Sequence, residues 1–435
     1  MDDIAKLMMV DDKLLSALAR EGPINRVRAG EVMERFGVDA IVTGDPLNVF
    51  HILGYWPHIA STKAGYPPTT FAILPRDPAA PPAIVTSHFI YYYSFVDGGP
   101  RDQVPAYLFE AARDDGAILE AAPNPGFFAD LGEAPMTEIE ERRRDRTNRA
   151  ARPGHFFTDA GSALARAIKE LGLWQGTLAY DHDVIRAVCE RRERPGPLVP
   201  ADNLLRWIRM VKSPLEVALM RRASEANVAA VDAVIASVRA GADYRELRRL
   251  FDVESARRGN RSVFMTVDRV STPLAIDHRV REGQSLFFDG VSHYQNYHGD
   301  YARTVFVGEP TSAIRKTARA AVAGWEAIRE QLRPGMRYSE VSAIGKDVLR
   351  RVGVGDHITF GPHSVGLMHT DEPGAELGGF YGKNDLLLEE NMILSVDCPS
   401  IATGIGGSVH IEDLVLITSD GAVPIHPITD HVITL

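Results

Sequence analysis

Residues 286–304 read LFFDGVSHYQNYHGDYART, and this stretch decides how the second half of the chain folds. Its apolar start predicts a buried strand that carries Asp289, and the apolar run that follows Asp300 predicts a second strand. A turn containing Asn296 and Gly299 would fold the two strands, and the two carboxylates, back toward one another. Carboxylates held this close share either a proton or a cation, because like charges cannot both stay ionised without compensation.

Three candidate ligands for a cation follow downstream. His363 lies between an apolar run and a glycine, and Asp397 ends the apolar run that starts at Ile393. Glu412 stands at the head of an apolar strand expected within residues 409–417. Two Asp, one His, a third Asp and one Glu form an oxygen-rich ligand set that suits Mn²⁺, Fe²⁺, Co²⁺ or Zn²⁺. The sequence therefore predicts one or two divalent metal ions bound by Asp289, Asp300, His363, Asp397 and Glu412.

In this order and in these contexts, the five positions resemble the pita-bread metallopeptidase superfamily, most closely its two-domain prolidase, aminopeptidase P and creatinase branch. Residues 45–55 look like the start of that branch's N-terminal domain, and residues 206–216 like the junction before its catalytic domain. The resemblance implies an α/β fold with an N-terminal three-layer creatinase-like domain, residues 1–205, and a C-terminal pita-bread domain, residues 206–435. It also implies a homodimer.

Local patterns support this organisation. Alternating strand and helix patterns in the first 90 residues are typical of an α/β domain. Ser213, Pro214 and Glu216 form a capping-box signature, which predicts a helix starting there. Further helices are expected over residues 246–258, 312–332 and 339–352.

The chain departs from the peptidase pattern of the superfamily at four positions. Asp397 stands where the family has Glu, and Ala302 where the peptidases usually have Thr. Thr272 stands where the peptidases carry a His before the first Asp ligand, and His278 is out of register with that position. His369 follows His363 by six residues, where the family spacing is seven. These changes leave the metal ligands in place but argue against an unmodified peptidase.

Two histidines are candidates for proton transfer to a leaving group, His369 and His410. His410 replaces a basic residue that the family commonly has two positions before the last Glu ligand. His293 and His298 are either ordinary packed histidines or further sources of acid–base function.

Some neighbours of these residues are expected to be structural. Asp413 points to the opposite strand face from Glu412, which favours a structural anchor. Tyr297 and Arg303 are expected to pack and pair around the site rather than react.

Composition narrows the class of protein. The net charge of −10 argues against a nucleic-acid partner or an anionic membrane surface. The two cysteines, Cys189 and Cys398, form no disulfide framework, which favours a reducing compartment. No apolar run approaches the ~18 residues that a membrane span needs, and the first residues lack a signal-peptide pattern. A cytoplasmic protein without a membrane partner is expected.

The resemblance implies a metal-dependent hydrolase of the Xaa-Pro dipeptidase or aminopeptidase type. It would cleave an amide or imide C–N bond in a dipeptide or other small carboxylate-bearing substrate by a metal-activated water. The departures keep two alternatives open. One is a non-peptidase enzyme on the same fold, either a dimethylsulfoniopropionate-type lyase or a creatinase-like amidinohydrolase. The other is a catalytically inactive binding protein.

Overall fold

The computed structural model describes residues 2–57, 68–97, 104–111, 131–152, 154–272, 278–374 and 384–435, without the side chains of residues 2–8 and 111. Its contacts divide the chain into two compact units. The first unit is built mainly of Met9–Ile208, and the second mainly of Arg209–Pro373 and Lys383–Leu435. The boundary expected between residues 205 and 206 stays a prediction.

The first unit contains a mixed sheet. Among the described residues its seven strands run in the order β5-β4-β3-β2-β1-β6-β7, and β2 is antiparallel to both of its neighbours. The strands are β1 (Ala40–Thr43), β2 (Thr70–Pro75), β3 (Ala83–Ser87), β4 (Ala106–Ala111), β5 (Phe156–Asp159), β6 (Leu178–Tyr180) and β7 (Leu198–Pro200). The helical segments before residue 211 are α1 (Asp2–Glu21), α2 (Arg26–Arg35), α3 (Pro46–Leu53), α5 (His88–Tyr93), η1 (Phe95–Asp97), α6 (Glu138–Ala150), α7 (Ala160–Glu170), α8 (Asp183–Arg191) and α9 (Asp202–Met210).

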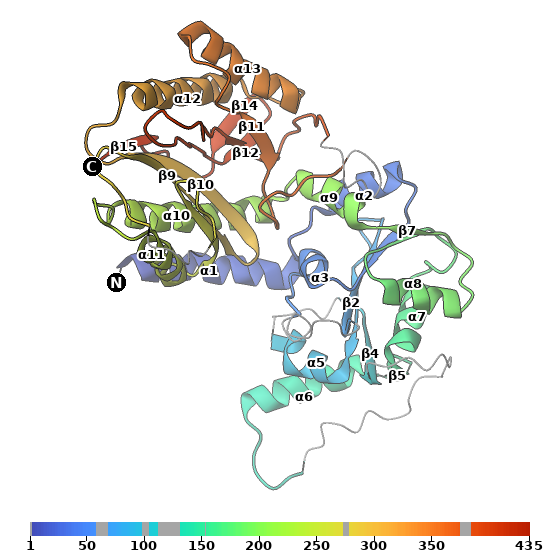
Figure 1. The fold of residues 1–435 in the computed structure, drawn as a ribbon. Helices are drawn as coiled ribbons and strands as arrows, with labels where there is room; N and C mark the ends of the chain where they lie inside the picture. The colour runs from blue at the N-terminus through green and yellow to red at the C-terminus, as the bar shows by residue number, and fades with distance from the viewer. Residues whose placement is uncertain are drawn as a thin grey trace. The chain divides into compact units, whose positions relative to one another are not determined.

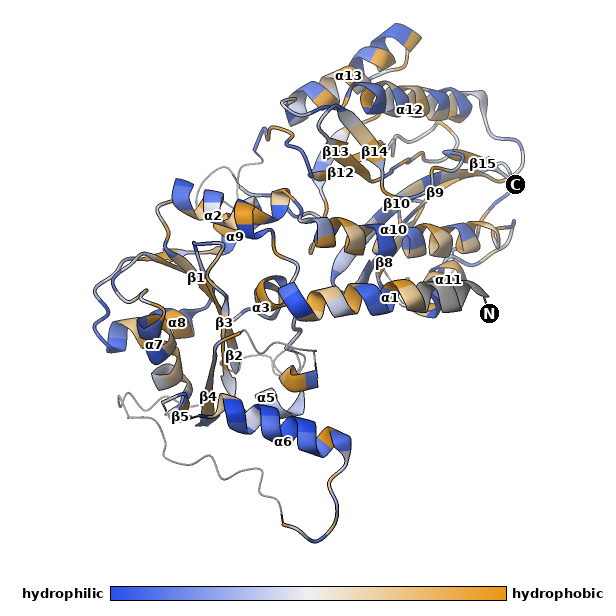
Figure 2. Cartoon of the chain, turned by 180° about the vertical axis from the view of Figure 1, so that it is seen from behind, coloured by the Kyte–Doolittle hydropathy of each residue, from blue (hydrophilic) through white to orange (hydrophobic). Residues whose placement is uncertain are grey.

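The first unit has three layers, because side chains that alternate along its strands pack in two different cores, one on each face of the sheet. Ile41 of β1 packs in a core with residues of α2, α3 and α9, whereas its neighbours Ala40 and Val42 pack in a second core with residues of α7 and α8. Successive side chains of a strand point to opposite faces, so the sheet separates two layers of helices. In Figure 2 the strands are largely apolar, while α6 is almost entirely hydrophilic.

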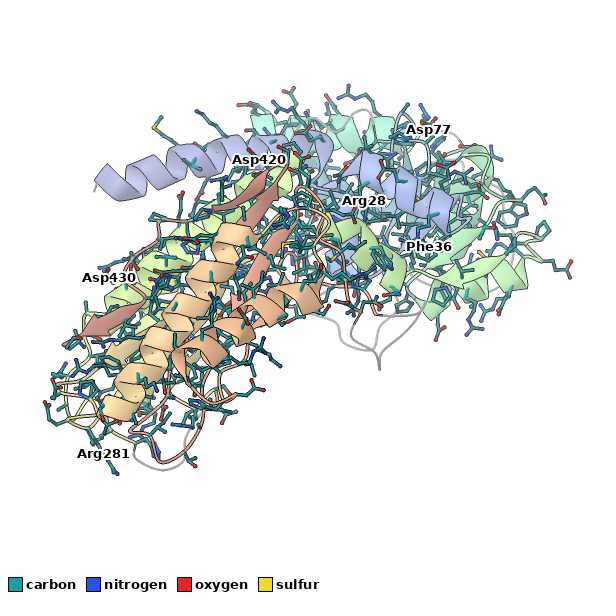
Figure 3. All side chains as sticks on the ribbon, turned by 90° about the horizontal axis from the view of Figure 1, so that it is seen from above. Arg28, Phe36, Asp77, Arg281, Asp420 and Asp430 are labelled. Carbon is teal, nitrogen blue, oxygen red and sulfur yellow. The ribbon has the colours of Figure 1, made fainter. Side chains whose placement is uncertain are left out.

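The second unit carries two smaller sheets. Within the described part of the chain each has four strands, in the orders β15-β10-β9-β8 and β11-β12-β13-β14. Helices α10 and α11 pack on the first sheet, and α12 and α13 contact the second (Figure 1). Figure 3 shows α12 and α13 lying together over the strands of this unit. The elements are α10 (Pro214–Ile235), α11 (Tyr244–Arg257), β8 (Arg261–Val267), β9 (Ser285–Tyr294), β10 (Tyr297–Phe306), α12 (Ser312–Gln331), α13 (Tyr338–Val352), β11 (Gly361–Ser364), β12 (Ile393–Asp397), β13 (Val415–Thr418), β14 (Gly421–Pro424) and β15 (Val432–Thr434).

The hairpin between β9 and β10 turns earlier than predicted. Gln295 and Asn296 form the turn with φ values of 46° and 64°, the left-handed conformation that a tight two-residue hairpin turn requires. Asn296 was correctly placed in the turn. Gly299 was not, since it lies within β10 opposite Ser292.

The expected start of α10 is confirmed. The Ser213 side chain accepts a hydrogen bond from the backbone N–H of Glu216, and the Glu216 carboxylate accepts one from the backbone N–H of Ser213. None of the described helices combines the length and apolar character that crossing a membrane requires.

Candidate metal centre

The β9–β10 hairpin presents both aspartates on one face. Asp289 pairs with Ala302, and Asp300 pairs with Val291, so the two carboxylates lie diagonally across the strand pair. The opposite face of the hairpin packs closely on α10. A Cβ added to Gly299 would meet the Cβ of Asn227 at 2.8 Å, which explains why glycine stands beside Asp300.

The second sheet supplies two more ligand candidates. His363 of β11 stands opposite Ser395 of β12, and Asp397 lies two residues further along β12 on the same face. Glu412 comes next in the chain. It does not head a strand, as the sequence suggested, because β13 begins only at Val415. Its backbone instead forms an isolated bridge with Ala302 of β10, which joins the first sheet to the chain that leads into the second.

The five predicted ligands converge. His363 Nε2 lies 3.8 Å from an Asp300 oxygen, 3.5 Å from an Asp397 oxygen and 3.5 Å from a Glu412 oxygen. Asp289 joins the same constellation through Glu412 and His410, because one ligand atom from each of the three lies within 4.8 Å of the others. Side chains separated by up to 123 positions in the sequence therefore meet around one point.

Both histidines proposed for proton transfer also face this centre. His369 Nε2 lies 3.0 Å from an Asp300 oxygen, and the His369 side chain is 34% exposed. His410 Nε2 lies 3.5 Å from a Glu412 oxygen, and the His410 side chain is only 6% exposed. The structure thus separates an accessible imidazole from a buried one.

Several buried ligand atoms of the centre have no hydrogen-bond partner, which suits a bound cation. Both carboxylate oxygens of Asp300 and one of Asp289 are buried without a hydrogen-bond partner, and so are both ring nitrogens of His363. A buried polar atom without a partner is costly, and a buried carboxylate more so. A divalent ion would satisfy these atoms together, and the donor set of carboxylates with imidazole suits a first-row transition metal.

The pKa values of these groups are shifted because several carboxylates are buried close together. Burial, followed by the nearby Glu412 carboxylate, raises the pKa values of Asp289 and Asp300 well above their usual range. Burial also raises the pKa of Glu412, but His363 and His410 oppose this and hold it well below its usual range. Burial lowers the pKa of His410, whereas Glu412 raises it, and the net result is about 9.

Sequence reasoning missed Ser395, whose hydroxyl donates a hydrogen bond to Glu412. The signal was present, because Ser395 precedes Asp397 by two residues and therefore shares its strand face. A buried support on the other side of His363 was also missed. Lys212 donates to the Ser364 hydroxyl over 3.0 Å, and Arg209 donates to Asp371 over 2.8 Å.

Other histidines singled out in the sequence lie outside the ligand groups. His298 has Nδ1 3.2 Å from the carbonyl of Gly366, and its ring is 5.4 Å from that of His293. The edge of His278 packs on Tyr244. Within the described residues, none of the three joins a group that could hold a metal ion.

Comparison with known proteins identifies the part of the chain that carries this centre. Residues 218–419 match the model of metallopeptidase family M24. The chain is 27% identical over 229 residues to an Xaa-Pro dipeptidase of Pyrococcus furiosus, covering 51% of this chain and 64% of that protein. It is 30% identical over 245 residues to the probable dipeptidase PepE of Mycobacterium tuberculosis, covering 52% and 61%. The matched region thus spans less than two thirds of these relatives.

Solved structures resemble nearly the whole chain. A dipeptidase from Pyrococcus horikoshii OT3 superposes with a TM-score of 0.68 at 16% identity, covering 94% of this chain and all of that one. An Xaa-Pro dipeptidase from Bacillus anthracis gives a TM-score of 0.62 at 17% identity, covering 94% and 99%. The predicted fold class, a three-layer α/β domain followed by a pita-bread domain, is confirmed by this likeness.

Proposed function

We propose that the protein is a metal-dependent hydrolase of the Xaa-Pro dipeptidase or aminopeptidase type, because residues 218–419 match the model of metallopeptidase family M24. Its substrate would be a dipeptide or another small molecule with a carboxylate, cleaved at an amide or imide C–N bond. We further propose that Asp289, Asp300, His363, Asp397 and Glu412 are the protein ligands of one or two divalent ions, drawn from Mn²⁺, Fe²⁺, Co²⁺ and Zn²⁺.

One observation carries the proposal. Asp300 is fully buried at the meeting point of the five side chains, and neither of its carboxylate oxygens has a hydrogen-bond partner. A purely structural role would leave this buried carboxylate with only His369 Nε2, 3.0 Å away, and His363 Nε2, 3.8 Å away, to offset its charge. A bound cation would offset the cost of burying the Asp300 carboxylate and would make metal-dependent hydrolysis possible at this centre.

The positions of the side chains around the centre suggest a different role for each. Bound metal would supply an activated water and polarise the scissile carbonyl. Ser395 orients Glu412 through its hydroxyl. His369 is exposed enough to reach a substrate, so we assign to it the transfer of a proton to the leaving nitrogen. His410, the other histidine predicted for this step, is only 6% exposed, which favours His369 for it.

The second candidate is a non-peptidase reaction at the same centre, a lyase or an amidinohydrolase. It is favoured by Thr272, which leaves the peptidase histidine position without an imidazole. The nearest sequence candidate, His278, packs on Tyr244 outside the ligand groups of the described residues.

Three finer expectations belong with the proposal. A cytoplasmic location is supported by Cys189 and Cys398, which are both free and buried. The homodimer is supported by the family resemblance, and light scattering on the purified protein checks it. Manganese, as one of the four metals that suit the donor set, is checked by elemental analysis.

The test is a substrate comparison on protein reconstituted with each metal. Xaa-Pro dipeptides, dimethylsulfoniopropionate and creatine are assayed in parallel, with a chelator-treated sample as the blank. Turnover of Xaa-Pro dipeptides alone supports the peptidase, whereas turnover of either other substrate selects the alternative. Protein that binds metal but turns over none of them contradicts the Xaa-Pro peptidase and favours the binding protein, and protein that binds no metal refutes the proposal.

A further inference from the structure

We propose that His410 is itself a metal ligand, which forms with Asp289 and Glu412 a three-residue binding position. The inference rests on the proposed function, because it concerns the same ion centre. It adds a ligand to the five predicted ones and changes the role of a residue that the sequence had offered for proton transfer.

The spacing of the ligand atoms carries the inference. His410 Nε2 lies 3.5 Å from a Glu412 oxygen and 4.0 Å from an Asp397 oxygen. These separations exceed a normal hydrogen bond of about 2.7–3.2 Å. Two ligands bound to one ion through bonds of about 2.1 Å lie roughly 3.0–3.4 Å apart, depending on the angle at the metal. The imidazole and the carboxylates therefore stand close to the spacing that a shared ion sets.

The ring is fixed in this position by its surroundings. The backbone N–H of His410 donates to the Thr304 hydroxyl over 3.1 Å, and that hydroxyl lies 2.9 Å from the His410 carbonyl. On the ring itself, Phe287 packs at an angle of 88° with the centroids 5.3 Å apart. A side chain locked by backbone bonds and packing is suited to a fixed coordination geometry, because little conformational entropy remains to be lost.

His410 and His369 differ in how far their side chains are exposed to solvent. The His410 side chain is 6% exposed and lies among acidic ligands, whereas the His369 side chain is 34% exposed. A proton carrier has to reach the leaving group, while a ligand has to reach only the ion. The difference in exposure therefore favours His410 as a metal ligand and His369 as the proton carrier.

The experiment measures metal binding rather than turnover. Full-length protein is stripped with a chelator, and its Co²⁺ affinity and visible absorption spectrum are compared with those of His410→Ala and His410→Gly. We expect about 10–100-fold weaker binding and an altered spectrum in both variants, with free imidazole restoring both readouts in His410→Gly. His369→Ala should keep the Co²⁺ affinity within about threefold while losing turnover. His357→Asn, an imidazole bonded to Ser400 outside the ligand groups, is the matched control and should bind like the wild type.

The outcomes separate the inference from the proposed function. Wild-type protein that binds no Co²⁺ refutes the metal centre as a whole. Wild-type binding that His410→Ala leaves unchanged in affinity and spectrum overturns the role of His410 alone. Should the alanine variant fail to fold, His410→Asn keeps a side chain of similar size without an imidazole and gives the same comparison.

Discussion

Arg303 donates a hydrogen bond from Nη2 to Oδ1 of Asp413 over 2.6 Å, and neither side chain has any exposed surface. Trp325 Nε1 donates to the other oxygen of Asp413 over 2.9 Å, and His431 Nε2 lies 3.0 Å from that oxygen. Asp413 directly follows Glu412, so this buried network holds the chain at the point where Glu412 enters the metal centre.

Removing Arg303 from its pair with Asp413 should strongly destabilise the folded protein. Arg303→Met leaves the Asp413 carboxylate buried without its cation, and we expect a loss of about 3–5 kcal/mol in the free energy of unfolding. Urea denaturation measures it. The control is Arg315→Ala, which breaks a pair with the 86%-exposed Glu309 and should cost less than about 1 kcal/mol. Equal losses in both variants would contradict the structural role of Asp413.

Asp413 also predicts a pH dependence. Burial raises its pKa, but Arg303 and the nearby histidines lower it to about 2, against an unfolded value near ~3.9. A depressed carboxylate pKa stabilises the folded state above the unfolded pKa, so the contribution of roughly 2 kcal/mol should be lost as the pH falls from about 4 toward 2. Unfolding of wild type and Asp413→Asn across this range checks it, because the difference between them should shrink at low pH.

Lys212 should also make stability rise with pH, at alkaline pH and through the loss of a penalty rather than the gain of a favourable interaction. Burial lowers its pKa to about 8, so the unfolded state binds the extra proton between about pH 8 and 10.5. The cost of burying this charge is fully present below pH 8 and disappears as the pH rises through the window. Relative to Lys212→Met, which keeps the length without the charge, wild-type protein should gain stability from pH 8 to 10.5. A stability difference that stays flat would contradict a buried, charged lysine.

If the centre binds metal, Asp300 should contribute to metal binding but not to the stability of the metal-free protein. Asp300→Asn removes a carboxyl group whose ionisation is opposed by burial and by Glu412, so the chelator-treated variant should be at least as stable as the wild type. The same variant should lose the stabilisation that added metal gives the wild type. Thermal unfolding with and without Mn²⁺ measures both effects. A variant destabilised without metal would argue that Asp300 is structural.

Ser395 supplies a finer test, because it touches a ligand without being one. Ser395→Ala removes the hydrogen bond to Glu412, and we expect metal affinity to fall about 10-fold or more, with a loss of about 1–3 kcal/mol in the free energy of unfolding. Ser342→Ala is the matched control, since that hydroxyl donates to the Phe360 carbonyl over 2.6 Å, away from the ligands. Metal affinity that is equal in both variants would remove Ser395 from the site.

Much of the candidate site could be predicted because its ligands sit on strands of obvious apolar character. Asp289, Asp300 and Asp397 adjoin short apolar runs that are typical of buried strands, and the capping box at Ser213 is a local signal that depends on only four residues. Predictions that required exact boundaries were weaker. Gly299 was placed in the turn and Glu412 at a strand start, because neither the turn conformation at Gln295 nor the bridge to Ala302 leaves a mark in the local pattern.

The sequence by itself determined the identity and order of the metal-ligand candidates, the approach of Asp289 and Asp300 through a strand pair and, through the family resemblance, the fold class. The candidates follow from side-chain chemistry and from the family resemblance, which also implied the fold class, whereas the single strands and helices follow from local patterns of apolar residues. Only the tertiary structure decided that His410 is buried and His369 accessible, and that Ser395 meets Glu412. Those relationships depend on how two sheets distant in sequence approach one another, and packing between such elements is not encoded in any single stretch of the chain.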